Sequence, residues 1–246
     1  MGNSLLAVRD INRKYIVVGK EVRIMSVLSL KNISYSYGAT PVLDNLSYDF
    51  EAGHMYCIVG KSGAGKTTLL SILSGLAAPK QGSIFYKEQD IKSIDKYKFR
   101  SKYIGVIFQS FNLITKFTAM ENVMLSMDIA GVKNSRKKET AINLLMNVGL
   151  TEEEARRRVL KLSGGQQQRV AIARALSYNP DIILADEPTG NLDGDTQREI
   201  MKIFRELAEQ GKCVILVSHS PEVAEMCDIC YELKKTTRRT KKKGRS

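Results

Sequence analysis

The sequence predicts an α/β domain built on a mostly parallel sheet. Short apolar runs, interpreted as buried strands, recur at Met55–Gly60, Tyr103–Phe108, Ile182–Ala185 and Cys213–Ser218. Stretches of helical periodicity separate these runs, and strands that alternate with helices form parallel sheets. Polar or glycine-rich residues follow each run. Because parallel strands bind ligands beyond their carboxyl ends, the sequence predicts a single site at one edge of the sheet.

An antiparallel β subdomain is predicted at the N-terminal side of this sheet. The stretches Val27–Tyr37 and Leu43–Phe50 alternate between apolar and polar residues and are rich in Ser and Tyr. Such alternation is typical of strands that bury one face only.

Residues 60–67 fit G-x-x-x-x-G-K-[ST], the pattern of a P-loop, between an apolar strand and a predicted helix over Lys66–Gly75. Glycines let the backbone approach phosphate oxygens, and successive N–H groups form a nest for an anion. Lys66 is predicted to reach the β- and γ-phosphates and Thr67 to hold Mg²⁺. The predicted nucleotide-binding residues here are Gly60, Lys61, Ser62, Gly63, Ala64, Gly65, Lys66, Thr67 and Thr68.

A helical insert is predicted at about residues 110–160, since no apolar strand occurs between Gln109 and Leu162. Helices are expected at Thr118–Ala130, Arg136–Val148 and Glu152–Val159. The charged run in the last of these is interpreted as a solvated helix face. Phe111 and Leu113, which lead into the insert, either belong to the core or line a docking groove.

A second phosphate-binding element is predicted at Leu162–Gln166, which precedes a helix from Gly164 to about Tyr178. The first N–H groups of a helix are unpaired and its dipole is positive there, so this terminus attracts anions. The run Ile182–Glu187 follows and ends in Asp186 and Glu187, which suit a metal and an attacking water. One chain thus carries two phosphate-binding elements.

The four cysteines indicate a reducing, cytosolic compartment. Cys57 and Cys213 fall in predicted core strands, where a thiol packs as a small apolar group. Cys227 and Cys230 form a C-x-x-C without a second pair or a nearby His, which favours packing at a helix end over zinc. The chain has no apolar run long enough to span a membrane and no signal-peptide pattern at its start.

The net charge of +12 is concentrated in residues 234–246, which hold eight Lys or Arg and no acid. This basic tail is interpreted either as a solubilising end or as a segment attracted to anionic lipid headgroups. Nucleic acid is not an expected partner, because no aromatic residues interleave the basic ones.

Together these motifs resemble the nucleotide-binding subunit of an ABC transporter, a P-loop NTPase. The resemblance covers roughly residues 26–233. Its motifs occur in the family's order: Gly60–Thr67, Gln109, Leu162–Gln166, Ile182–Glu187, Gly190–Asp193 and His219. The stretches Gly105–Leu113 and Asp186–Asp193 further resemble the bacterial branch of lipoprotein-releasing, macrolide-exporting and peptide-antibiotic-resistance ATPases.

The resemblance implies a site shared between two subunits that pair head to tail, with ATP and Mg²⁺ as cofactors. Each ATP would lie between one subunit's P-loop and the other's signature residues, here Ser163, Gly164, Gly165 and Gln166. Asp193 would couple the two sites, and a lone subunit should hydrolyse ATP poorly.

The resemblance also implies a role for each residue at the predicted sheet edge. Asp186 would hold Mg²⁺ and Glu187 would act as general base or orient the water. His219 would hydrogen-bond the γ-phosphate, while His54 is interpreted as incidental. Gln109 would sense Mg²⁺ and water and couple the helical insert to the nucleotide.

The start of the domain occurs twice, since residues 5–15 parallel residues 27–37. Residues 1–24 are interpreted either as an upstream remnant, with Met25 as a second start, or as an added edge strand. The ATPase domain is then expected over residues 25–233. Tyr37 resembles the aromatic residue that stacks on adenine in this family, and Tyr35 is a weaker candidate. If residues 1–24 formed an added edge strand, Tyr15 would compete with Tyr37 for the adenine.

The predicted function is the ATP-hydrolysing subunit of a bacterial exporter or extractor. It would lie on the cytoplasmic face of the inner membrane and work with a separate permease. The alternative is a non-transport ABC ATPase that regulates a membrane partner in cell division or signalling. A soluble repair or translation protein is disfavoured, because the sequence shows neither a long coiled coil between the P-loop and the signature nor a second ATPase domain.

Overall fold

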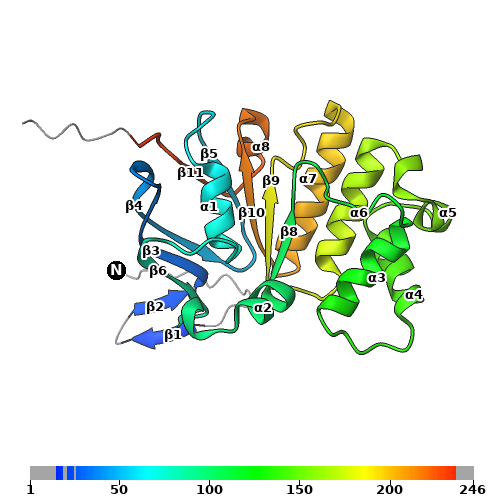
Figure 1. The fold of residues 1–246 in the computed structure, drawn as a ribbon, viewed down its shortest axis with the longest axis horizontal. Coiled ribbons are helices and arrows are strands. Elements are labelled where there is room, and N and C mark those ends of the chain that lie inside the picture. Colours follow the sequence, from blue (N-terminus) through cyan, green and yellow to red (C-terminus); the bar gives the residue numbers. More distant parts are fainter. Residues whose placement is uncertain (1–14, 19–20, 25, 237–246) are drawn as a thin grey trace, which may run out of the picture.

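Five parallel strands form the centre of the fold in the computed structural model, which describes residues 15–18, 21–24 and 26–236 (Figure 1). In order across the sheet they are β11 (Ile229–Glu232), β5 (Met55–Val59), β10 (Cys213–Ser218), β9 (Ile182–Asp186) and β8 (Ile104–Ile107). All four pairings are parallel, which confirms the predicted sheet. The sequence prediction did not include the short edge strand β11, which carries Cys230. The thiols of Cys227 and Cys230 still donate to Val223 O and Ala224 O of the helix Pro221–Glu225, as predicted for packing at a helix end.

Alternation along the buried strands divides the core into two layers. In β10, Val214 and Leu216 pack with the helices α3 to α7. Cys213, Ile215 and Val217 face the opposite side and pack with α1 and the antiparallel sheet. Because both faces are covered, these strands are apolar throughout, as parallel strands generally are.

The antiparallel sheet is confirmed at the N-terminal side and lies on the left in Figure 1. Its order is β4-β3-β6-β7, with bounds Thr40–Glu51, Ser26–Tyr37, Gln81–Tyr86 and Gln89–Asp90. The sequence prediction missed β6 and β7. The first three residues of β6 are Gln, Gly and Ser, and β7 has only two residues, so neither carries the apolar run of a buried strand.

Helices follow the strands and build the insert at the right of Figure 1. The insert holds α3, α4, α5 and the 3₁₀ turn η3, with bounds Ala119–Ile129, Lys137–Asn147, Glu152–Arg156 and Val159–Lys161. The helix expected over Glu152–Val159 therefore ends three residues early. Thr118 and Thr151 each begin a helix with a reciprocal capping box.

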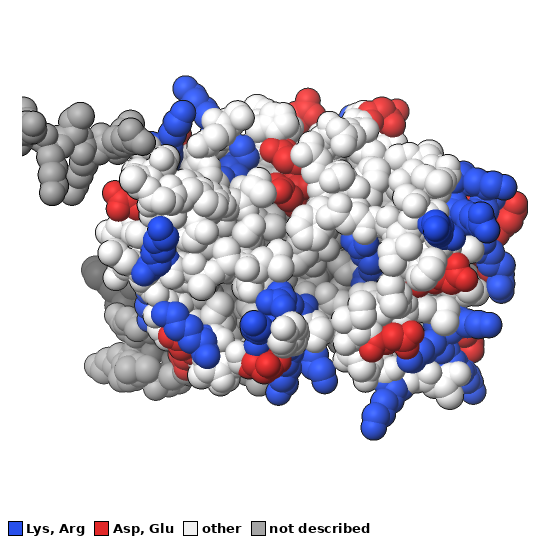
Figure 2. Space-filling model, viewed as in Figure 1, with Lys and Arg blue, Asp and Glu red and all other residues white. Residues whose placement is uncertain are grey.

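The remaining helical elements flank the two sheets. Four are α-helices: α1 at Lys66–Leu73, α6 at Gly164–Leu176, α7 at Gly194–Glu209 and α8 at Pro221–Glu225. The others are short: the 3₁₀ turn η1 at Ile91–Ser93, the helical turn α2 at Lys96–Lys98 and the π-helical turn η2 at Phe99–Tyr103. None of the helices in the described part of the chain is both long and apolar enough to cross a membrane. In Figure 2, basic and acidic side chains are interspersed over the helical insert.

The described part of the N-terminal segment forms a two-stranded sheet of its own. Its strands are β1 and β2, with bounds Tyr15–Val18 and Glu21–Ile24, and they pair with each other. These residues are therefore not an added edge strand of either larger sheet. The predicted repeat at residues 5–14 and the tail beyond Thr236 lie outside the described residues, so the lipid-binding prediction remains a prediction.

One carboxylate ties the beginning of the P-loop strand to the segment before β11. Asp228 Oδ2 accepts a hydrogen bond from Met55 N at 2.7 Å, and the backbone N–H of Asp228 donates to Met55 O at 2.9 Å. Arg205 of α7 donates to both oxygens of the same carboxylate. Burial alone would raise the pKa of Asp228, but the hydrogen bonds from Met55 and Arg205 outweigh burial and lower the pKa below its ordinary value.

We expect Asp228→Asn to lower the free energy of unfolding by about 1–3 kcal/mol at pH 7, because it removes charge-assisted hydrogen bonds. Since folding depresses the pKa, this stabilisation exists above the unfolded value near 4 and is lost as the pH falls below it. Urea unfolding at pH 7 and pH 3 measures both effects. Asp195→Asn is the control, at a more exposed carboxylate that pairs with Arg198 alone among the described residues. Equal losses in the two variants would contradict the assignment.

Candidate active site

A cavity of about 840 Å³ lies beyond the carboxyl ends of β5, β8, β9 and β10. In-register pairing brings these ends together: Val59 is level with Ser218, and Val217 is level with Asp186. The residues that line the cavity include Gly60–Gly63, Gly65–Thr68, Gln109, Asp186, Glu187 and His219. The four predicted groups at the sheet edge thus share one cavity.

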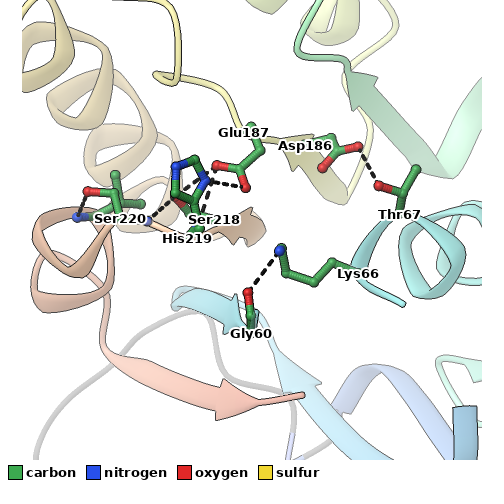
Figure 3. Close-up of polar contacts among 9 residues, drawn as sticks. Gly60, Lys66, Thr67, Asp186, Glu187, Ser218, His219 and Ser220 are labelled. Carbon is green, nitrogen blue, oxygen red and sulfur yellow. Dashed lines mark hydrogen bonds and ion pairs between the residues drawn. The ribbon is translucent and has the colours of Figure 1, made fainter. Parts of the chain in front are cut away.

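The P-loop wraps back on itself at the entrance to α1. Ala64 N donates to Lys61 O at 3.0 Å, and the Lys66 ammonium donates to Gly60 O at 2.9 Å (Figure 3). Gly65 has φ 98°, and a Cβ there would lie 2.8 Å from Val42 Cγ1, so only glycine fits. Ala64 is buried beneath the loop and does not line the cavity.

Two side-chain oxygens of the cavity lining lie close together. Thr67 Oγ1 lies 3.4 Å from Asp186 Oδ2 (Figure 3). Burial, together with the neighbouring Glu187, raises the pKa of Asp186 above its ordinary value. A hydroxyl and a carboxylate suit Mg²⁺, which is held by one or two protein oxygens together with substrate phosphates. No cluster of three or more His, Cys, Asp or Glu that could hold a metal occurs among the described residues.

Glu187 is held in a strained backbone conformation directly after β9. Its φ is 44°, in the left-handed region, and its N–H donates to Val217 O at 2.8 Å. Its carboxylate lies 2.8 Å from His219 Nδ1 and accepts a hydrogen bond from Ser218 Oγ at 3.2 Å (Figure 3). The strand end of β10 therefore fixes the direction in which this carboxylate points.

Tyr37 lies next to the P-loop but does not line the cavity. Its ring is 60% exposed and its hydroxyl lies 3.5 Å from Thr68 Oγ1. Tyr35 packs edge-on against it at 5.1 Å between ring centroids and is the less exposed of the two rings. An exposed aromatic face beside the phosphate loop is available for stacking. His54 bonds the Ala52 carbonyl and lies outside the cavity lining.

The signature residues form the first turn of α6 and lie outside this cavity. Ser163 caps the helix in a reciprocal capping box with Gln166. Gln166 also donates to Glu154 Oε1 of α5 at 2.6 Å. A Cβ at Gly165 would lie 2.6 Å from Thr196 Cγ2 of α7, so a side chain there would collide with the neighbouring helix.

Asp193 begins α7 and likewise lies outside the cavity. It accepts hydrogen bonds from Thr196 N at 2.9 Å and Thr196 Oγ1 at 2.8 Å, which lower its pKa. The structure therefore divides the predicted residues into a set that lines the cavity and a set, including the signature and Asp193, that does not.

Several residues near the site were not identified from the sequence. Ser218 bonds Glu187, Glu154 bonds Gln166, and Val42 and Glu232 line the cavity. Ser218 precedes His219 at a strand end, a position that could have been identified. The other three carry no motif, and only the fold brings them to the site.

The P-loop, the acidic pair and the separate glycine-rich helix terminus define an ATP-hydrolysing cassette of the P-loop class. The family model described as "ABC transporter" matches residues 43–190, more than half of the chain. The chain belongs to the ABC transporter family of ATP-binding proteins and is an ATPase, which confirms the resemblance and the fold class.

The comparisons with individual proteins agree. The ABC transporter ATP-binding protein YclH of Bacillus subtilis is 44% identical over 212 residues, which cover 85% of this chain and 94% of YclH. The bacterial cassette MJ0796, solved as a dimer, is 38% identical with a TM-score of 0.76 over 84% of this chain and 94% of that one. It has also been solved in a post-hydrolysis state with ADP and Pi, at 37% identity and a TM-score of 0.77 over 85% and 97%.

A third similar protein is CbiO1 of Clostridium perfringens, part of the transporter complex CbiONQ. It is 25% identical with a TM-score of 0.76, over 87% of this chain and 88% of that one. None of these comparisons distinguishes the export branch within the family.

We expect Lys66→Ala to weaken ATP binding by about 10- to 100-fold, as loss of a charge-assisted contact of roughly 1.5–3 kcal/mol implies. Titration with a fluorescent ATP analogue measures the affinity. Lys80→Ala, which removes the same charge outside the cavity, should leave the affinity unchanged. A similar loss in both variants would indicate a net-charge effect and contradict a phosphate contact by Lys66.

Proposed function

We propose that this ATPase energises a bacterial membrane exporter or extractor through ATP-driven head-to-tail dimerisation, with a separate permease chain. It would work at the cytoplasmic face of the membrane. The observation that carries the dimerisation is the separation of the two phosphate-binding elements. The P-loop lines the cavity, whereas the signature turn at Ser163–Gln166 does not. Within that turn Ser163 N and Gln166 N donate to each other's side chains, so the N–H groups of Gly164 and Gly165 are the ones that an anion would meet.

A glycine-rich helix terminus at the surface can bind an anion that belongs to another molecule. Ser163 and Gly164 are exposed, and α6 is long enough to contribute a dipole at this end. A two-fold arrangement brings each signature to the other subunit's nucleotide with one self-complementary interface. The dimeric structure of MJ0796 supports this arrangement by similarity.

The permease and the direction of transport are proposed from similarity to other proteins. CbiO1 is part of a transporter complex, and a comparable partner is proposed here. The exporter branch rests on the resemblance of Gly105–Leu113 and Asp186–Asp193 to that branch.

Thr67 and Asp186 fit a Mg²⁺ ion by their donor chemistry, and Gln109 lines the same cavity. When bound, the ion would offset the negative charge of the phosphates. Lys66 and the P-loop N–H groups would bind the β- and γ-phosphates. Tyr37 would stack on the adenine.

Glu187 would orient the attacking water and accept its proton on the carboxylate. His219 would hold the γ-phosphate, and Ser218 would keep the Glu187 carboxylate in place. Catalysis would depend mainly on positioning and charge stabilisation, as in phosphoryl transfer generally.

We expect Glu187→Gln to retain ATP binding and to lower turnover by about 100-fold or more, the usual contribution of a general base. Because ATP is then not consumed, the variant should accumulate as an ATP-bound dimer on size exclusion. Phosphate release measures turnover. Glu232→Gln is the matched control, since Glu232 lines the same cavity and its nearest basic group, that of Lys234, is 3.9 Å away. Unchanged turnover in Glu187→Gln would remove this assignment.

Mixing two inactive variants tests the head-to-tail site directly. Lys66→Ala disables the P-loop, and Gly164→Glu would place a carboxylate against the partner's γ-phosphate. The second change fits the fold, because a Cβ at Gly164 meets nothing closer than 3.9 Å. A mixed dimer contains one intact site, so an equal mixture should recover up to about one quarter of wild-type hydrolysis. No recovery, or an active Gly164→Glu variant alone, would refute a site shared between subunits.

A further inference from the structure

The loop after β8 has a backbone that is unfavourable by itself. Gln109 lies at the cavity, and two residues later Phe111 and Asn112 have φ values of 59° and 49°. A residue with a Cβ costs roughly 1–2 kcal/mol in the left-handed region, although Asn adopts it more readily than Phe. Phe111 in particular therefore requires support from its surroundings.

Arg174 supplies that support from the last turn of α6. Its guanidinium donates Nη2 to Phe111 O at 2.8 Å and Nη1 to Asn112 O. Burial lowers the pKa of Arg174, and among the described residues no carboxylate lies within ion-pair distance of it. The positive charge is therefore compensated by the two carbonyls of the strained residues.

The far end of the same loop is held by α3. The buried Asn122 accepts a hydrogen bond from Ile114 N at 2.8 Å and donates to Ile114 O at 3.2 Å. The segment 109–114 thus begins at the cavity with Gln109 and is held by hydrogen bonds to α6 and α3, two helices packed against the core.

The helix that carries Arg174 also carries the signature glycines. Gly164 and Arg174 are ten residues apart, about 15 Å along α6. Because α6 is one continuous helix from Gly164 to Leu176, its hydrogen-bonded backbone links its first turn to its last.

We propose that Arg174 is a positioning residue that fixes the segment 109–114, the Gln109 loop, to α6. When one ATP binds at the signature end of α6, the contact through Arg174 would position Gln109 beside the other ATP, which is bound to the P-loop of the same chain. This inference rests on the proposed function, because it uses the shared dimer site. Arg174 acts through Gln109 and does not line the cavity itself.

The test compares Arg174→Met with Arg169→Met. Arg169 is the matched control, since it lies on the same helix, donates to the Val148 carbonyl and pairs with Glu199, but does not touch the Gln109 loop. Arg174→Met should accelerate amide hydrogen exchange at Phe111 and Asn112, whose N–H groups bond within the loop. Arg169→Met should not. Unchanged exchange in Arg174→Met, or equal acceleration in both, would overturn the proposal.

A double-mutant cycle with Gln109→Ala adds a functional readout. In the wild-type background, Arg174→Met should lower kcat by up to about 100-fold, the scale of a catalytic group misplaced by about 1 Å, and leave ATP affinity unchanged. In the Gln109→Ala background the same change should have little further effect, because both act at one point. Additive losses would overturn the proposal. A wild-type rate in Gln109→Ala would instead refute the proposed role of Gln109, and the exchange result at Phe111 and Asn112 would still show whether Arg174 holds the loop.

Discussion

The parallel register of β5, β10, β9 and β8 is the constraint on which the site depends. Val59, Ser218 and Asp186 end their strands at nearly the same level, so the P-loop, His219 and Glu187 emerge side by side. Each strand is buried on both faces, and a slip of one residue would turn every apolar side chain of that strand to the wrong layer. The packing that stabilises the fold therefore also sets the distances in the cavity.

Strained backbone occurs beside this cavity and is held by named contacts. Glu187 is fixed through Val217 O and by its contacts with Ser218 and His219. Phe111 and Asn112 are fixed by Arg174. Conformations of this kind persist only where the surroundings over-determine them, and they recur at sites where geometry carries function.

The two phosphate-binding elements give the chain an incomplete site at each of two surfaces. Gln166 bonds Glu154 of α5, and Gly165 lies against Thr196 of α7, so the signature contacts the helical insert on one side and the core on the other. Under the proposed function, ATP joins the two elements across the dimer, and the signature's contact with the γ-phosphate exists only in the closed state. Hydrolysis then shifts the population towards separation, as in other switches of this kind.

The sequence by itself determined the fold class, the two phosphate-binding motifs and their order, because apolar runs and glycine patterns are local. It missed β11, β6 and β7, whose short or polar strands form only by pairing with β5, β3 and each other. It also did not show which residues Ser218, Glu154 and Arg174 contact, namely Glu187, Gln166 and the loop 109–114. These contacts join residues 12 to 63 positions apart. Tertiary structure alone decided them, since a hydrogen bond depends on where the packed helices and strands place its two atoms.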